Sequence, residues 1–330
     1  MSDDCCDPTT SITRFQNPKV FCPNTMIMSK QSSIDNMKSI CFYCSYFTGI
    51  NLPYYVKCYL LELTRHFNEL VLLTNKKEMS VIDLTFLDQH TIQWMPCENK
   101  GFDFGMWYKA FEKYPIEDYQ QVGLMNDSCI LFRSLDRVFA TIDKSGWDYC
   151  GILDSIELGY HPQSYFIVIS QKAISLVGKY FKQNGIIEDF ENVITTYEIG
   201  LSKYLVEHNC QIGAVYNYTD FACNLNCSFH KIKELIKAGF PLIKKKIISR
   251  NYRRSEIENL ASVGFDFRAK NYLNLIENCN KNSLLIDMPL LKNDFNDKLI
   301  NLKLFFRIPF WSTYFKIRAM AANFYHKFIK

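Results

Sequence analysis

The stretch that decides the fold begins as Asn99-Lys-Gly-Phe-Asp-Phe-Gly-Met-Trp107 and closes as Val122-Gly-Leu-Met-Asn-Asp-Ser128. Between these motifs the pattern predicts one helix over residues 105–114 and a buried strand over residues 121–125. In an open α/β sheet, ligands bind just beyond the carboxyl ends of the strands. We therefore expect the glycine-bearing loop and the polar strand end to face one ligand site.

The polar residues of these two motifs suit the recognition of a nucleotide sugar. Glycine lets a backbone approach a ligand or adopt positive φ, and a carboxylate accepts hydrogen bonds from a sugar or a base. Each motif alone is more typical of a structural feature, a glycine turn in the first and a helix N-cap in the second. Because both flank one helix, we predict that they bind the donor, through Asn99, Gly101, Asp103, Asn126, Asp127 and Ser128.

Strands and helices alternate along most of the chain. We predict strands over residues 40–47, 70–74, 91–95, 147–153, 166–170 and 211–216, and further helices over residues 53–67, 131–144 and 195–208. This alternation predicts an α/β fold with a doubly wound, mostly parallel sheet flanked by helices. The turn at residues 48–51, after the first strand, is a second candidate ligand loop.

Composition indicates a large folded domain. Of 330 residues, 48% are hydrophobic, and the net charge of +4 is too small to indicate nucleic-acid binding. The 13 cysteines show no framework spacing, and no signal peptide or spanning apolar run is visible, so we expect a cytoplasmic protein with reduced thiols. We predict a mobile lead-in over residues 1–37, a catalytic domain over residues 38–250, and a basic, helical extension over residues 251–330.

Two groups of cysteines invite a metal interpretation that the spacing does not favour. Cys41 and Cys44 form a CxxC pair, but residues three apart on a strand point to opposite faces, so we predict that they pack in the core. A second group of potential zinc ligands matches no zinc-finger spacing, so a structural zinc site is the minor alternative there. Its members are His208, Cys210, Cys223, Cys227 and His230.

Five short blocks in order carry a family resemblance. They are Asn99-x-Gly-x-Asp-x-Gly105, Asn126-Asp-Ser128, Tyr160-His-x-Gln-Ser-Tyr-Phe166, Tyr197-Glu-x-Gly-Leu-Ser202 and Gly239-Phe-Pro-x-Ile-Lys-Lys245. Residues 40–251 thereby resemble the rhamnan synthesis F family of polysaccharide glycosyltransferases. The resemblance implies a GT-A-like fold and transfer of a sugar, such as the deoxyhexose rhamnose, from a nucleotide donor to a glycan or glycolipid acceptor.

The resemblance also implies roles for acidic residues. GT-A enzymes hold a divalent ion, Mn²⁺ or Mg²⁺, with an Asp-x-Asp motif, which makes Asp127 the predicted metal ligand. Only one carboxylate stands at residues 126–128, so a metal-free site that relies on Lys and His is the alternative. We predict Glu198, early in the helix at residues 195–208, as the catalytic base, with Asp154 as its rival. We further predict that the substrate is bound by His161, Gln163, Ser164 and Tyr165.

The basic C-terminal third leaves two interpretations open. Lys244, Lys245 and Lys246 suit either a solvated helix face or a positive rim for phosphates. The aromatic and cationic residues of 302–330 suit either a helix packed on the domain or a segment bound at an anionic membrane surface. The runner-up function is a non-catalytic nucleotide- or sugar-binding subunit of a glycan assembly complex, which the single carboxylate at Asp127 keeps open.

Overall fold

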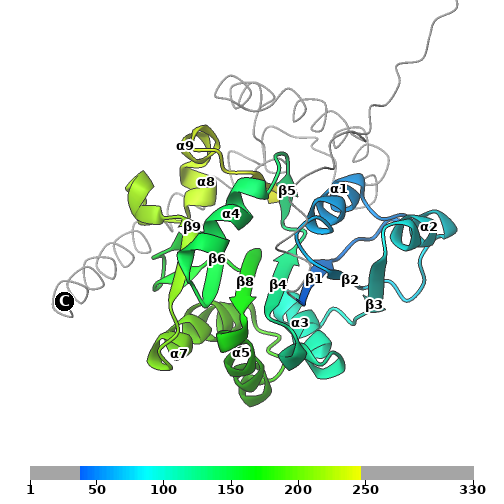
Figure 1. The fold of residues 1–330 in the computed structure, drawn as a ribbon, viewed down its shortest axis with the longest axis horizontal. Helices are drawn as coiled ribbons and strands as arrows, with labels where there is room; N and C mark the ends of the chain where they lie inside the picture. The colour runs from blue at the N-terminus through cyan, green and yellow to red at the C-terminus, as the bar shows by residue number, and fades with distance from the viewer. Residues whose placement is uncertain (1–37, 247–330) are drawn as a thin grey trace, which may run out of the picture. The chain divides into compact units, whose positions relative to one another are not determined.

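An eight-stranded sheet forms the centre of residues 38–246, the part of the chain that the computed structural model describes (Figure 1). Its strands are β1 (Ser39–Ser45), β2 (Glu69–Thr74), β3 (Ile92–Pro96), β4 (Gln121–Asn126), β6 (Tyr149–Ser155), β7 (His161–Pro162), β8 (Phe166–Ser170) and β9 (Ile212–Tyr216). Each expected strand is present, within two residues of its predicted bounds. β7 is an additional strand that the sequence pattern did not reveal.

The strand order β3-β2-β1-β4-β8-β6 confirms a doubly wound, mostly parallel sheet. β1, β2, β3 and β4 pair in parallel, and β9 pairs in parallel with β6. β8 is antiparallel to both of its neighbours, β4 and β6, and β7 is antiparallel to β6. The inserted β8 keeps β4 and β6 parallel to each other, so their carboxyl ends lie at the same edge of the sheet.

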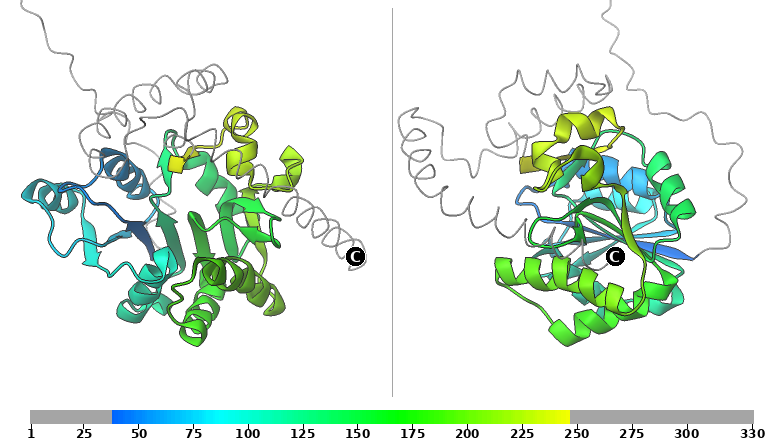
Figure 2. Two further views of the ribbon diagram at one scale, coloured as in Figure 1. Left: turned by 180° about the vertical axis from the view of Figure 1, so that it is seen from behind. Right: turned by 90° about the vertical axis from the view of Figure 1, so that its left-hand side faces the viewer.

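Helices cover both faces of the sheet (Figures 1 and 2). One face carries α1 (Tyr54–Leu63), α4 (Asp136–Ser145), α8 (Cys227–His230) and α9 (Ile232–Lys237), and the other carries α3 (Phe102–Lys113), α5 (Gln171–Asn184) and α7 (Leu201–Glu207). Short helical segments complete the described chain: α2 (Val81–Gln89), η1 (Ile116–Asp118), α6 (Phe190–Val193), η2 (Ile194–Gly200) and η3 (Tyr218–Phe221). Residues 38–246 thus form a three-layer α/β structure.

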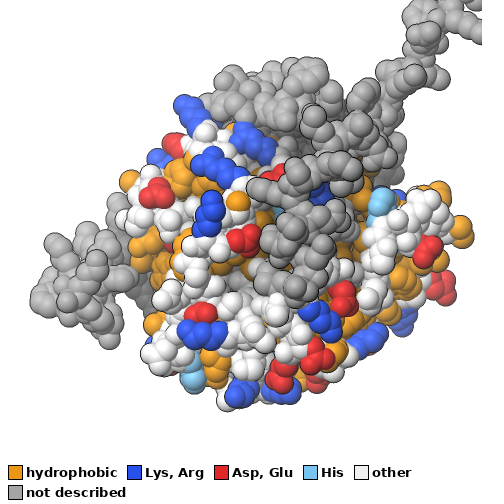
Figure 3. Space-filling view, in the orientation of Figure 1, with side chains coloured by type: hydrophobic (Ala, Val, Ile, Leu, Met, Phe, Trp, Pro, Cys, Tyr) orange, Lys and Arg blue, Asp and Glu red, His pale blue; other side chains and the backbone are white. Residues whose placement is uncertain are grey.

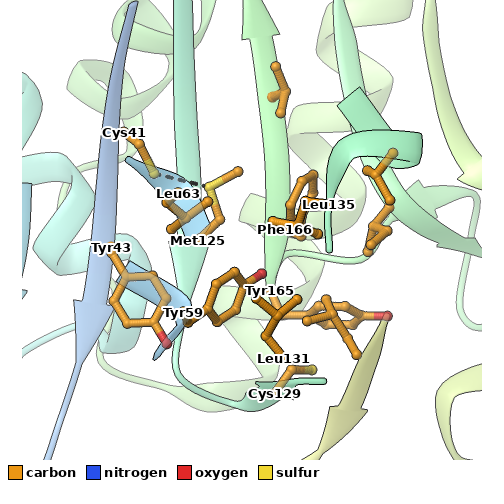
Figure 4. Packing of buried hydrophobic residues seen from close by; sticks show 14 of the residues in the cluster. Cys41, Tyr43, Tyr59, Leu63, Met125, Cys129, Leu131, Leu135, Tyr165 and Phe166 are labelled. Carbon is orange, nitrogen blue, oxygen red and sulfur yellow. Dashed lines mark hydrogen bonds between the residues drawn. The ribbon is translucent and has the colours of Figure 1, made fainter. Parts of the chain in front are cut away.

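Side chains of one strand alternate between two hydrophobic cores. Cys41 and Tyr43 of β1 pack in the core beneath α1 and α4, which Figure 4 shows, whereas Phe42 and Cys44 pack in the core above α3 and α5. Burying a large apolar side chain stabilises the fold by about 1.5–3 kcal/mol. The alternation confirms that Cys41 and Cys44 are packing residues on opposite faces.

A small ribbon stands apart from the main sheet. β5 (Cys129–Leu131) pairs antiparallel with β10 (Leu242–Lys244), and the register sets Lys244 opposite Cys129. The helix predicted over residues 131–144 was therefore placed too early, since α4 begins at Asp136. The ribbon matters because it brings the distant segment that follows β10 back to the end of β4.

Part of the basic character after residue 230 lies on the surface. Lys and Arg side chains gather over α4 and α9 on the face seen in Figure 3, where Lys233 and Lys237 are exposed. The segment is not uniformly helical as predicted, because residues 242–244 form β10. The proposed lead-in at residues 1–37 and the extension at residues 251–330 lie outside the described residues. Among the described helices, none has the length and apolar character needed to cross a membrane.

Candidate active site

The polar strand end at residues 126–128 lies where the carboxyl ends of two parallel strands meet. The register places Asn126 of β4 beside Cys44 of β1, and the amide of Asp127 donates to the carbonyl of Cys44 over 3.0 Å. Oδ2 of Asp127 accepts hydrogen bonds from the hydroxyls of Ser45 (3.0 Å) and Tyr55 (3.2 Å). The carboxylate is therefore fixed by β1 and by the first turn of α1.

Lys245 completes this cluster from the far end of the described chain. Its Nζ lies 3.0 Å from Oδ2 of Asp127 and donates to the Tyr55 hydroxyl over 2.9 Å. Its backbone amide donates to the carbonyl of Ser128 over 2.9 Å, which continues the β5–β10 ribbon. The lysine is thus held by backbone pairing as well as by its charge.

Asp103 links the glycine-bearing motif to the strand end. Nδ2 of Asn126 donates to Oδ2 of Asp103 over 2.7 Å, and Oδ1 of Asn126 accepts the backbone amide of Ser128 over 3.1 Å. Burial raises the pKa of Asp103 to about 7; the Asp127 carboxylate acts in the same direction, and Lys245 opposes it. The structure therefore brings the two motifs together, as the spacing predicted.

The two glycines of that motif serve the backbone of α3. Gly101 has a φ of 73° at the N-cap of the helix, and a Cβ on Gly105 would lie 1.8 Å from the carbonyl oxygen of Lys100. α3 begins at Phe102 and not at Gly105 as predicted, so Asp103 lies in its first turn. Asn99 is exposed before the helix.

A second polar group lies around Glu198. Oε1 of Glu198 accepts the Ser164 hydroxyl over 2.5 Å, and its Oε2 lies 3.8 Å from Nε2 of His161. Nδ1 of His161 lies 2.9 Å from the Gly159 carbonyl oxygen, to which it can donate, and its Nε2 lies 3.2 Å from Nε2 of Gln163. His161 is a buried residue of the short strand β7, and both of its ring nitrogens contact other groups of the protein.

Glu198 stands in a different helical context from the one predicted. It lies within η2, a π-helical segment that continues α6 and leads into α7, so it is not in a first turn. π-helical turns widen the helix locally and often occur at functional sites. The Glu198 side chain is 21% exposed, which leaves it accessible to a substrate.

Asp154 and Tyr165 are both committed to internal contacts. Oδ1 of Asp154 accepts the amide of Tyr218 over 2.6 Å, and burial raises the pKa of Asp154 to about 6. The Tyr165 hydroxyl pairs with Oγ of Ser228 at 3.2 Å, and its ring lies in the core of Figure 4. Tyr165 therefore offers no open aromatic face to a sugar.

Lys244 lies against that buried tyrosine. Its Nζ is 4.7 Å from the centre of the Tyr165 ring and 5.1 Å from that of Phe229, distances typical of cation–π contacts. Burial lowers the pKa of Lys244, while Glu198 is among the neighbours that raise it. Lys245 is thus paired with Asp127, whereas Lys244 is a buried cation whose charge interacts with Glu198.

Sequence reasoning missed three residues of this cluster: Ser45, Tyr55 and Lys245. The phosphate-rim interpretation of residues 244–246 named Lys245 but gave it no partner. Ser45 and Tyr55 flank the turn at residues 48–51 that was a candidate ligand loop, yet a lone hydroxyl carries no signal of its own. Their contacts with Asp127 follow from strand pairing and helix docking.

The contacts of Asp127 do not fit a divalent ion. Magnesium binds carboxylate oxygen at about 2.0–2.1 Å and repels other cations, whereas Oδ2 of Asp127 already faces an ammonium and two hydroxyls. Within residues 38–246, the one group of three metal-ligating side chains is Glu62, His66 and Asp136. This group contains none of the five zinc candidates between His208 and His230.

That group of three belongs to the packing of α1 against α4. Glu62 accepts the backbone amide of Leu135 over 2.7 Å, Arg65 pairs with Asp136 at 3.1 Å, and the His66 ring stacks on Phe139. The hydrogen bonds and Arg65 outweigh desolvation, so the pKa of Glu62 falls to about 2. An ion-pair network explains these side chains without a metal.

One protein-family model matches most of the chain. The family model described as rhamnan synthesis protein F matches residues 70–285, more than half of the chain. No curated protein matches the sequence.

Solved structures give only distant likenesses. A cytidylyltransferase from Leptospira borgpetersenii is 12% identical, with 78% of this chain and 100% of that chain covered and a TM-score of 0.37. The 4-diphosphocytidyl-2C-methyl-D-erythritol synthase from Anaerococcus prevotii is 10% identical, with 56% of this chain and 88% of that chain covered and a TM-score of 0.37. The glucosyl-3-phosphoglycerate synthase from Mycobacterium tuberculosis is 8% identical, with 46% of this chain and 68% of that chain covered and a TM-score of 0.30. At these TM-scores we draw no conclusion from the likenesses.

Proposed function

The chain belongs to the rhamnan synthesis protein F family, and from this premise we propose that it is a glycosyltransferase. It moves a sugar from a nucleotide-sugar donor to a glycan or glycolipid acceptor. The observation that carries the proposal is the gathering of Asp103, Asp127 and Lys245 at the carboxyl ends of β1 and β4, with Glu198 close enough to influence the charge of Asp103.

The reaction has two electrostatic demands. The acceptor oxygen forms a bond to the anomeric carbon of the donor while the bond from that carbon to the diphosphate breaks, and the electron pair leaves with the diphosphate. Positive charge must stabilise the departing diphosphate, and a base must take the proton of the acceptor hydroxyl. We assign Lys245 to the stabilisation of the diphosphate and Glu198 to the removal of the proton.

The surroundings of Glu198 support its assignment as the base. The Ser164 hydroxyl donates to Oε1 of Glu198 and orients the carboxylate, while part of the side chain is open to solvent. Asp154 is a weaker candidate, because it is 2% exposed and already accepts the Tyr218 amide. We therefore keep Asp154 in a structural role and Glu198 in the catalytic one.

The donor side of the site is assigned to Asp103 and Ser128, whose polar atoms suit the ribose or sugar hydroxyls, with Asn126 orienting both through its amide. The family name supports a deoxyhexose such as rhamnose as the transferred sugar. His161 and Gln163 are buried and contact each other, so we give them a structural role beside Glu198.

Donor turnover tests this function. Wild-type protein would be incubated with UDP-, dTDP- and GDP-linked sugars, with glycan and glycolipid acceptors, and the release of nucleoside diphosphate would be measured. We expect one donor to be consumed in an acceptor-dependent manner. Tight nucleotide binding without consumption of any donor would replace the enzyme with the runner-up, a binding subunit of a glycan assembly complex.

A further inference from the structure

We propose that Lys245 is a built-in replacement for the divalent ion, so that the protein binds the diphosphate of its donor without a metal. The inference rests on the proposed function and deepens it, because it names what stabilises the leaving group. It starts from the ion pair between Lys245 and Asp127, which occupies the position where a metal–carboxylate contact would otherwise form.

The first step concerns the carboxylate. Three donors converge on Oδ2 of Asp127: the hydroxyls of Ser45 and Tyr55 and the ammonium of Lys245. A divalent ion on that oxygen would have to displace donors fixed by β1, α1 and the β5–β10 ribbon. It would also stand next to a fixed positive charge.

The second step concerns the missing second carboxylate. Asn126 occupies the neighbouring position, and both ends of its amide are used, one by Asp103 and one by the Ser128 amide. Asp127 belongs to no group of three convergent metal-ligating side chains in residues 38–246. The acidic ligand set that a hard cation prefers is therefore not assembled.

The third step concerns the lysine itself. An ammonium has three N–H donors, and the described contacts of Nζ in Lys245 use two of them, toward Asp127 and Tyr55. Its side chain is 33% exposed, so the remaining donor can reach a phosphate oxygen. Asp127 and Tyr55 orient the ammonium, and the ribbon fixes its backbone.

The distinguishing experiment measures nucleotide affinity with and without metal. Binding of UDP, dTDP and GDP to the wild-type protein would be measured by calorimetry in EDTA and again in MnCl₂. We expect the affinity for the preferred nucleotide to agree within about twofold between the two conditions.

Variants then test the lysine. Lys245→Met should weaken nucleotide binding by about tenfold or more, the range expected for a lost hydrogen bond to a charged group. Lys245→Arg should retain most of the affinity. Lys179→Met, which removes one exposed positive charge on α5, is the matched control and should bind as the wild type does.

Three outcomes overturn the inference. A loss of about tenfold in wild-type affinity on adding EDTA would show a metal requirement, and the proposed function would still stand. Unchanged affinity in a folded Lys245→Met protein would remove the role of the lysine, also without touching the function. Absence of nucleotide binding in both buffers would overturn the proposed function together with the inference.

Discussion

Glu198 and Asp154 are the two acidic residues considered as the catalytic base, and their contacts favour Glu198 as the base and Asp154 in a structural role. Replacing Glu198 with Gln keeps the size and the bond from Ser164 but removes the ability to accept a proton. We predict that Glu198→Gln lowers kcat by about 10²–10⁴-fold with donor affinity nearly unchanged, the pattern of an interaction used in the transition state. Steady-state kinetics and nucleotide titration measure the two quantities.

Asp154→Asn is the partner experiment. Because the side-chain oxygen of Asn can still accept the Tyr218 amide, we expect this variant to fold and to turn over the donor normally. If Glu198→Gln is active and a folded Asp154→Asn protein is inactive, the base has been assigned to the wrong residue.

Asp103 predicts a pH dependence of stability with a definite sign. Its folded-state pKa of about 7 lies above its ordinary value of 3.8, so the unfolded chain ionises first as the pH rises. The carboxyl therefore lowers stability progressively between about pH 4 and pH 7, and the cost is fully present above that range. Asp103→Asn should raise the free energy of unfolding by about 1–3 kcal/mol at pH 8, with the gain vanishing near pH 4.

Urea unfolding of the variant at several pH values checks this expectation. Asp88→Asn, on an exposed position of α2, is the control and should show no such trend. A gain for Asp103→Asn that is the same at pH 4 and pH 8 would mean that Asp103 titrates normally. Nucleotide binding by the same variant should be weaker than that of the wild type, since we assign Asp103 to the donor.

At the residue scale, the sequence indicates those site members that lie in compact motifs. Asp103, Asn126 and Asp127 stand next to a helix start or a strand end, so their place was predictable from local pattern. Lys245 and Tyr55 join Asp127 only through the β5–β10 ribbon and the docking of α1. Such long-range pairing leaves no local signal, and the interior position of Tyr165 was missed for the same reason.

At the scale of elements, the start of α3 depends on the absence of a side chain at Gly105. A Cβ there would meet the Lys100 carbonyl oxygen at 1.8 Å, a contact that only a backbone shift can relieve. We predict that Gly105→Ala lowers the free energy of unfolding by about 3 kcal/mol, the upper part of the range for overpacking. The shift would also displace Asp103, so nucleotide affinity should fall.

Gly178→Ala is the matched control within a helix. Its Cβ would meet Ile116 at 3.4 Å, which is ordinary contact, so the helix preference for alanine should leave stability unchanged or raise it by up to about 1 kcal/mol. Equal melting temperatures for the two variants would show that the α3 start is not strained by a side chain.

Other features of the elements were only partly predictable. The hydrophobic pattern located β8 but not its antiparallel direction, because a buried strand has the same composition either way. Helical periodicity likewise indicated a helix around Glu198 but not the π-helical turn of η2, whose shift of hydrogen bonding follows from packing. The Glu198 assignment rested on the family pattern of an acid at the start of a late helix, and the expected first-turn position was wrong.

At the scale of the whole molecule, the alternation of strands and helices was enough to predict the sheet and its flanking layers. The α/β fold alone does not bring the protein to a membrane. An acceptor held at a membrane would require the protein to bind at the membrane surface. Residues 302–330, which lie outside the described residues, carry the aromatic and basic composition for that role. Each basic residue near an anionic surface contributes about 1 kcal/mol.

We therefore propose a peripheral association with anionic membranes and predict that full-length protein sediments with phosphatidylserine vesicles at low salt. Replacing five basic residues with Gln should abolish sedimentation while donor turnover persists: Lys303, Arg307, Lys316, Arg318 and Lys327. Salt should weaken the wild-type interaction steeply. Sedimentation that is equal for both proteins would exclude this segment as the electrostatic anchor.

The most direct test of the central claim is a crystal structure of the protein with its preferred nucleoside diphosphate. The account predicts that a phosphate oxygen lies within hydrogen-bond distance of Nζ of Lys245 and that Asp103 faces the ribose. Glu198 should lie next to the terminal phosphate. A nucleotide bound elsewhere, with the cluster of Asp103, Asp127 and Lys245 untouched, would contradict it.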